Sequence, residues 1–190
     1  MATRGSWQLH EFPHLTYGNN ANHKITSRKT KRYNCIAWAG DDIERPWWPQ
    51  IDGWYWPSGI SEQEDIPAFI QAFRLLGYAV CADGSLEDGF EKVALFAEPD
   101  GTPTHAARQL RNGKWTSKLG PNEDIQHDDV RDVRGQLYGD VCCYMRRAIT
   151  PLSLHQRISR FFRCIRVLCK ESYWTIRAFV KGVPRKNVFS

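Results

Sequence analysis

The sequence contains no uninterrupted apolar run of about 18 residues, which is the length that a membrane-spanning helix requires. Its first residues also lack the apolar segment of a secretory leader, so we expect a protein that is cytoplasmic or exported by a route without such a signal. No two cysteines have the spacing of a CxxC pair, and this excludes the usual zinc-ligand and disulfide patterns. We therefore expect free thiols in a reducing compartment, with no metal and no cofactor.

Acidic residues are nearly absent from the end of the chain. Residues 150–190 hold 9 Lys and Arg against one Asp or Glu, a net charge of +8, whereas residues 1–149 hold 17 against 20, a net charge of −3. The overall charge of +5 therefore belongs to the tail. We expect three segments: a polar lead-in over 1–32, a catalytic domain over 33–149 and a basic tail over 150–190.

The basic tail has the pattern of an amphipathic helix. Apolar residues recur at spacings of three and four from Leu154 to Phe179, and arginines flank this stripe. Ser153 begins a capping box, and Gly182 stops the helix. A basic amphipathic helix suits an anionic membrane surface or an acidic protein partner, so residues 152–181 are the predicted docking element. Nucleic acid is the less favoured partner.

The body of the chain has the pattern of helices followed by strands. A helix is predicted over 61–77, where apolar residues fall on one face and where Asp65 and Pro67 suit the first turn. Strand patterns follow, and the Asn112-Gly113 pair between two of them is a strong hairpin signal. The predicted strands are 92–97, 104–110, 114–119 and 137–145. Helices first and then an antiparallel β-meander predict an α+β fold, completed by the C-terminal basic amphipathic helix.

A cysteine stands where a short helix of small residues is predicted to begin, and 70 positions later His105 opens a strand. A thiol acts as a nucleophile only as the thiolate, which a helix start and a histidine partner favour. Cys35 is therefore the candidate nucleophile and His105 the candidate base. The backbone N–H of Cys35 and the side chain of Asn34 are candidate oxyanion donors. The alternative is that the cysteine and the histidine are buried structural residues.

The third catalytic residue stays open between Asp124, Ser117 and His127. If the Asn-Gly pair forms a two-residue turn, Ser117 points away from the face of His105, whereas a three-residue loop with a bulge reverses this parity. The two-residue turn is the default for Asn-Gly, and a carboxylate stabilises an imidazolium better than a hydroxyl does. The residues by themselves therefore favour Asp124.

The segment 45–57 holds four of the eight tryptophans together with three prolines, so regular structure is excluded there. Its aromatic rings either complete the core or form one wall of a binding cleft beside the cysteine. The candidate substrate-binding residues are Trp47, Trp48, Trp54 and Trp56.

Three segments, Tyr33–Ala39, Asp83–Ala94 and Pro103–Gly120, resemble an uncharacterised bacterial domain family. That family is similar to papain-like cysteine hydrolases of the NlpC/P60 and transglutaminase kind. The resemblance covers roughly residues 30–147 and does not extend to the basic tail. The residues that usually surround the cysteine of NlpC/P60 enzymes are not matched, which counts against peptidoglycan cleavage.

The resemblance implies a papain-like fold in which Cys35 is the nucleophile and His105 the base. NlpC/P60 enzymes place a third polar residue on the strand after the histidine. On that implication Ser117 is favoured over Asp124, against the choice that hairpin geometry gives.

These observations predict a thiol hydrolase that acts on an amide or isopeptide bond of a protein or peptide, as a peptidase, amidase or deamidase. Bacterial domains of this size often serve as effectors or toxins, which is a second expectation. The alternative is a non-catalytic interaction module, whose basic helix docks on a membrane surface or an acidic partner.

Overall fold

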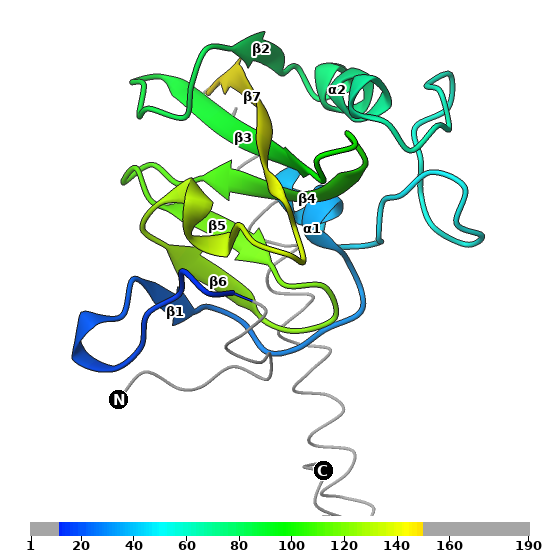
Figure 1. The fold of residues 1–190 in the computed structure, drawn as a ribbon. Coiled ribbons are helices and arrows are strands. Elements are labelled where there is room, and N and C mark those ends of the chain that lie inside the picture. Colours follow the sequence, from blue (N-terminus) through cyan, green and yellow to red (C-terminus); the bar gives the residue numbers. More distant parts are fainter. Residues whose placement is uncertain (1–11, 150–190) are drawn as a thin grey trace, which may run out of the picture. The chain divides into compact units, whose positions relative to one another are not determined.

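The structure is a computed structural model that describes residues 12–149, and the backbone of this part is mainly one antiparallel sheet (Figure 1). Neighbouring strands follow the order β1-β6-β5-β4-β3-β7-β2, and every neighbouring pair is antiparallel. The chain divides into two compact units, Met1–Ile149 and Thr150–Ser190, and the description concerns the first. The strands are β1 (His23–Ile25), β2 (Ala79–Cys81), β3 (Phe90–Ala97), β4 (Pro103–Gln109), β5 (Trp115–Lys118), β6 (Asp124–His127) and β7 (Asp140–Ala148).

Strand β3 is buried on both faces because apolar clusters cover both sides of the sheet, and successive side chains alternate between them. One face packs against the helices α1 (Cys35–Ala39) and α2 (Ile66–Leu75); we call it the helix side, and Leu95 belongs to its cluster. The opposite face, which we call the tyrosine side, has Phe96 and Tyr138 in its cluster. Each strand residue can therefore be assigned to a side by its register.

The expected papain-like α+β fold, with N-terminal helices ahead of a meander, is wrong. The described part has only two short helices, of five and ten residues, and its sheet begins with β1, ahead of both. α1 stops early because Gly40 caps it and Asp41 turns the chain with a φ of 65°. The three prolines of the segment 45–57 then exclude a further helix. The predicted C-terminal helix lies outside the described residues.

Helix α2 is shorter at both ends than the predicted 61–77. It begins after Asp65, whose carboxylate accepts a hydrogen bond from the backbone N–H of Ala68 at 2.8 Å. This confirms the expected N-cap, and Pro67 occupies the first turn, where a missing N–H costs nothing. The residues before Asp65 are excluded because a proline cannot sit deeper in a helix.

The connection between β4 and β5 corrects the expected two-residue turn. Ser117 pairs with Ala107, and this register leaves a loop of three residues, 111–113, whose glycine has a φ of 82°. Such a loop with a left-handed third residue is the next most common hairpin connection. Its extra residue reverses the parity of β5, so Ser117 lies on the same side of the sheet as His105.

Strand β6 is not among the predicted strands, because no apolar alternation marks it. The structure shows a strand that pairs with β5 on one side and with β1 on the other. Two of its polar residues, Asp124 and His127, are buried. Because the buried side chains of β6 are polar, the strand lacks the apolar alternation by which strands are predicted.

Among the residues that the structure describes, no helix has both the length and the apolar content that crossing a bilayer would require.

Candidate active site

Cys35 is the first residue of α1 and is buried, with 7 % of its surface exposed. Its Sγ lies 4.0 Å from the carbonyl oxygen of Thr104, and the backbone N–H of Ala106 also favours its thiolate. The thiol therefore contacts the backbone of β4 at Thr104 and Ala106, the two residues that flank His105 in the chain. Burial raises the pKa of Cys35 to about 11, and the charge of Lys118 acts against that rise.

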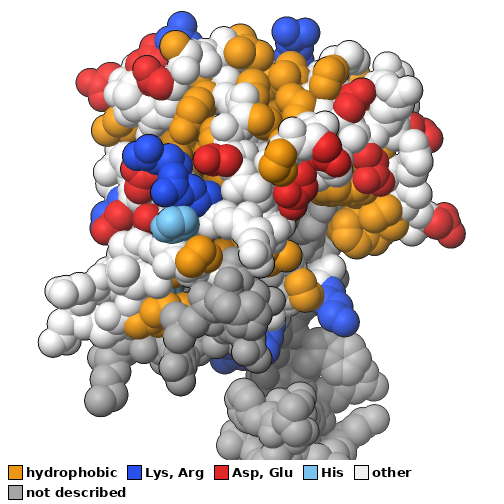
Figure 2. All heavy atoms as spheres, viewed as in Figure 1, with side chains coloured by type: hydrophobic (Ala, Val, Ile, Leu, Met, Phe, Trp, Pro, Cys, Tyr) orange, Lys and Arg blue, Asp and Glu red, His pale blue; other side chains and the backbone are white. Residues whose placement is uncertain are grey.

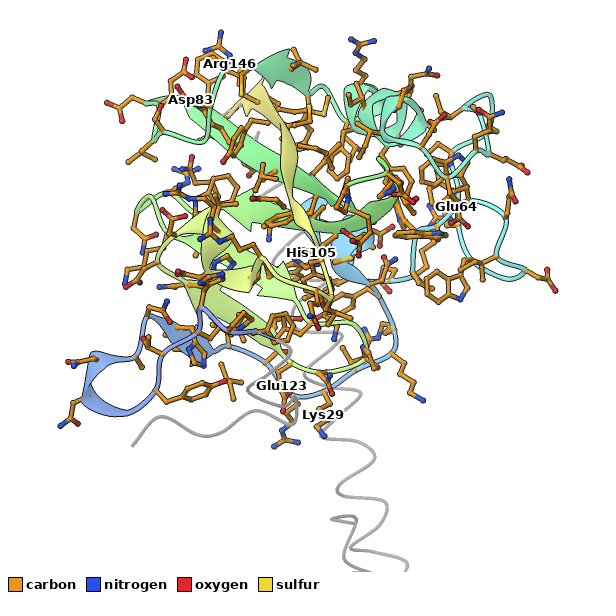
Figure 3. The ribbon with its side chains drawn as sticks, in the orientation of Figure 1. Lys29, Glu64, Asp83, His105, Glu123 and Arg146 are labelled. Atoms are coloured by element: carbon orange, nitrogen blue, oxygen red, sulfur yellow. The ribbon has the colours of Figure 1, made fainter. Side chains whose placement is uncertain are left out.

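His105 is buried on β4, and its label stands near the middle of the view in Figure 3. It pairs across the sheet with Phe96, which places its ring on the tyrosine side. The ring of Tyr138 stacks on it, with centroids 4.0 Å apart and planes 11° apart. Burial holds the pKa of His105 well below its usual value, and His127 adds to this effect, so the ring is neutral.

A chain of hydrogen bonds runs from His105 across two strands. Nε2 of His105 lies 3.0 Å from Oγ of Ser117, and the same Oγ lies 3.0 Å from Nε2 of His127. Nδ1 of His127 lies 2.7 Å from the carbonyl oxygen of Asp129. Burial lowers the pKa of His127 to about 4, so both imidazoles are neutral.

The carbonyl at the end of this chain fixes every proton in it. A carbonyl only accepts, so Nδ1 of His127 carries the hydrogen and its Nε2 is an acceptor. Ser117 must then donate its hydroxyl to His127 and accept from Nε2–H of His105. His105 is thereby held in the tautomer whose Nδ1 carries a lone pair. That Nδ1 is buried and has no hydrogen-bond partner among the described residues.

Cys35 and His105 meet at strand β4 but are not hydrogen-bonded to each other. The thiol approaches the strand from the helix side, where α1 packs, whereas the imidazole ring lies on the tyrosine side. The two residues that the sequence order suggested as a pair thus both contact or belong to β4, but on opposite sides of the sheet. The role of each as nucleophile and base remains a prediction.

Asp124 does not accompany His105. It lies on the helix side, where the hydroxyl of Tyr33 donates to its Oδ2 at 2.7 Å. Its other oxygen, Oδ1, is buried with no hydrogen-bond partner in the described part of the chain. The residue that hydrogen-bonds to His105 is Ser117, the position that the family resemblance implied.

The side chain of Asn34 is occupied by structural contacts. Its Oδ1 accepts from the backbone N–H groups of Ala37 and Trp47, and its Nδ2 donates to the carbonyl of Trp47. Asn34 therefore caps α1 and fastens the aromatic segment to it. The predicted oxyanion role would have to use the amide hydrogen that remains.

The four candidate tryptophans separate into two groups. Trp47 is buried, and its Nε1 donates to Asp42, while Trp48 and Trp56 each pack against Phe69 at 5.0 Å between ring centroids. These three rings contribute to the helix-side core. Trp54 is 40 % exposed and is the one available to a ligand. Figure 2 shows hydrophobic and acidic side chains side by side where this segment lies.

A groove of about 450 Å³ opens at the end of β3 and the start of β7. Glu98 and Asp140 supply carboxylates to it, and Gly139 lines it. Gly139 directly follows Tyr138, the ring that stacks on His105. The groove therefore begins one residue from the ring that covers the imidazole. Its lining residues are Ile66, Ala97, Glu98, Pro99, Gly101, Gly139, Asp140, Val141 and Cys142.

Sequence reasoning did not find two members of this region. Tyr138 falls within the predicted strand 137–145, and the signal that it lies in a turn is the pair of glycines at 135 and 139 that flank its loop. Lys118 falls within the predicted strand 114–119, and no pattern in the sequence shows that it is buried. Within residues 12–149 no group of His, Cys, Asp or Glu side chains is arranged to hold a metal ion.

Comparison with known proteins gives one match. The family model of DUF7689, a domain of unknown function, matches residues 24–146. No curated protein and no solved structure matches the chain. The matched range includes α1, His105 and the whole hydrogen-bond chain that starts from it.

Proposed function

The chain belongs to the DUF7689 family of domains of unknown function, and we propose that it is a cysteine-dependent hydrolase of amide bonds. Cys35 is the nucleophile and His105 the base in this proposal. The observation that carries it is the buried Nδ1 of His105, which has a lone pair and no hydrogen-bond partner in the described residues. A buried polar atom without a partner is costly, and such atoms are a feature of functional sites.

The chemistry begins from a neutral pair, because burial disfavours both the thiolate and the imidazolium. As Sγ of Cys35 forms a bond to the substrate carbonyl carbon, its proton moves to Nδ1 of His105, and the carbonyl π electrons move to oxygen. The carbon–nitrogen bond then breaks, and the imidazolium gives its proton to the departing amine. Water hydrolyses the thioester by the same steps, with the thiolate as leaving group.

Ser117 and His127 support this role of His105. They hold Nε2–H of His105 in one hydrogen bond before and after Nδ1 takes a proton, so the ring keeps its orientation. The low pKa of His105 makes its imidazolium a strong acid, which suits the protonation of a poor leaving group such as an amine.

The surroundings of the pair favour a peptide as substrate. The groove begins beside Tyr138 and offers room for an extended chain; its lining does not include Cys35 or His105, so in this proposal the substrate extends from the groove toward β4. Sγ and Nδ1 lie on opposite sides of β4 in this structure, so the proposed proton transfer requires the start of α1 or the ring of His105 to move when substrate binds.

The test is product formation from a mixed peptide pool, with new termini and deamidated side chains identified by mass spectrometry. We expect Cys35→Ala and His105→Ala to abolish product. Matched controls are Cys81→Ala, which removes a free thiol outside the groove, and His14→Ala, which removes an exposed imidazole. Product that persists in Cys35→Ala would refute the proposal.

A second proposal concerns the binding partner of the basic tail, which lies outside the described residues. We propose that residues 152–181 dock on an anionic membrane surface. The concentration of positive charge in 150–190, opposite in sign to the net charge of 1–149, supports it.

A further inference from the structure

Lys118 is a fully buried lysine on β5, one position after Ser117 and on the opposite side of the sheet. Its Nζ donates to the carbonyl oxygen of Asn122 and lies 5.5 Å from the centre of the Tyr33 ring. Lysine is almost never fully buried without a partner for its charge. The ammonium therefore needs an anion nearby.

Two acidic groups face this ammonium from the helix side. Burial lowers the pKa of Lys118, and the carboxylate of Asp124, opposite it on the neighbouring strand, acts against that lowering. The thiol of Cys35 is the second group, because its thiolate and the ammonium stabilise each other. Burial acts against both charges, and each charge reduces the cost of burying the other.

The register of β5 brings Lys118 to the start of α1. Thr116, on the same side, accepts a hydrogen bond from Nε1 of Trp38 at 3.2 Å, which places it under the later part of the helix. Lys118 lies two residues further along the strand, and Tyr33, beneath its ammonium, lies two residues before Cys35. The ammonium therefore faces the end of α1 from which the thiol projects.

We propose that Lys118 is a positioning residue of this site, whose buried ammonium is the counter-ion of the Cys35 thiolate. The consequence for turnover rests on the proposed hydrolase function, whereas the pairing itself does not. α1 has only five residues, too few for aligned peptide dipoles to supply much positive charge. His105 is neutral until it receives the thiol proton. Lys118 is thus the positive charge in place before the reaction starts.

Other charged groups face the same space and set the direction of the tests. Asp124 competes with the thiolate for the ammonium, and its raised pKa arises chiefly from burial. Glu123 acts on Lys118 in the same sense as Asp124, and Arg108 on β4 acts on Asp124. Tyr33 stays protonated, because burial and its bond to Asp124 raise its pKa.

The experiment measures the rate of iodoacetamide alkylation of Cys35 in the full chain against pH, read on the Cys35 peptide by mass spectrometry. Lys118→Met should raise the midpoint of this profile by about one pH unit or more, which slows alkylation roughly tenfold at pH ~8. Lys114→Met, which removes an exposed lysine of the same hairpin, should leave the midpoint unchanged. Equal midpoints in Lys118→Met and Lys114→Met would overturn the proposal.

Two further variants distinguish loss of the Lys118 charge from loss of the fold. Asp124→Asn removes the competing carboxylate and should lower the midpoint, the opposite direction from Lys118→Met. Lys118→Arg keeps the charge and should keep the wild-type profile, and thermal melting verifies the fold of each. A raised or unchanged midpoint in Asp124→Asn overturns the proposal. No substrate is needed, so failure of the hydrolase proposal would appear only in the peptide assay.

Discussion

At the scale of single residues, the feature that matters most is a hydroxyl between two imidazoles. Ser117 has no surface exposure and bonds to both His105 and His127. All three residues are candidates from the sequence; hairpin parity favours Asp124 as the partner of His105, whereas the family resemblance implies Ser117. The parity argument is wrong because an Asn-Gly pair fits both a two-residue and a three-residue loop, and the flanking strands decide between them.

Ser117→Ala should destabilise the protein by about 1–3 kcal/mol, because it leaves two buried ring nitrogens without a partner. Urea unfolding at neutral pH measures this change. The control is Ser85→Ala, which removes an exposed hydroxyl that donates to Asp83 within its own turn and should change stability little. Equal unfolding midpoints for the two variants would contradict the hydrogen-bond chain described for His105.

The pH dependence of stability follows from the buried histidines. Burial lowers the pKa of His127 from 6.5 to about 4, so the unfolded chain binds more protons between these values. Stability is therefore full above pH 6.5 and falls as the pH is lowered toward 4, by about 3 kcal/mol for this residue. His105 acts in the same direction, and Asp124, whose pKa is raised, acts in the opposite one.

His127→Gln isolates this contribution, because it removes one titrating group and keeps a polar side chain beside Ser117. We expect the stability of the variant to change less between pH 6.5 and pH 4 than that of the wild type. Denaturant unfolding at several pH values across this range gives the comparison. Parallel curves for the two proteins would show that His127 is not buried in its neutral form.

At the scale of elements, the loop between β6 and β7 positions the ring that covers His105. Gly135 and Gly139 close it with two backbone hydrogen bonds, and Thr104 donates to the carbonyl of Tyr138 at 2.6 Å. The sequence predicted the long strands because apolar runs mark them. It missed β6 and this loop because polar residues are buried in the first and glycines determine the second.

Gly139→Ala should destabilise the protein by about 3 kcal/mol or more. Its φ is 65°, and an added Cβ would lie 1.9 Å from the carbonyl oxygen of Ala97, so the backbone would have to move. Gly59→Ala is the matched control, because Gly59 also has a positive φ but no atom within 4 Å of the added Cβ. Both variants carry the strain of a positive φ, and only Gly139→Ala adds the clash, so the difference between their melting temperatures measures the clash. Similar melting temperatures would contradict the close approach of Gly139 to β3.

At the scale of the whole molecule, one sheet separates two polar systems. His105, Ser117 and His127 lie on the tyrosine side, and Lys118, Asp124 and Cys35 lie on the helix side. Alternation along β5 alone puts Ser117 and Lys118 on opposite sides. Sequence reasoning predicted the antiparallel strands but not this separation, because it requires the register across three strands, and one loop residue reverses it.

The charge asymmetry between 1–149 and 150–190 gives the last prediction, on the docking of the basic tail. The full chain should sediment with vesicles of phosphatidylcholine and phosphatidylserine, and not with phosphatidylcholine alone. Each arginine near an anionic surface contributes about 1 kcal/mol, so changing Arg157, Arg160 and Arg163 together to Glu should abolish binding. Changing the same three to Lys keeps the charge and should preserve it. Binding that survives charge reversal, or that does not weaken as salt is added, would mean that the tail does not dock through its positive charge.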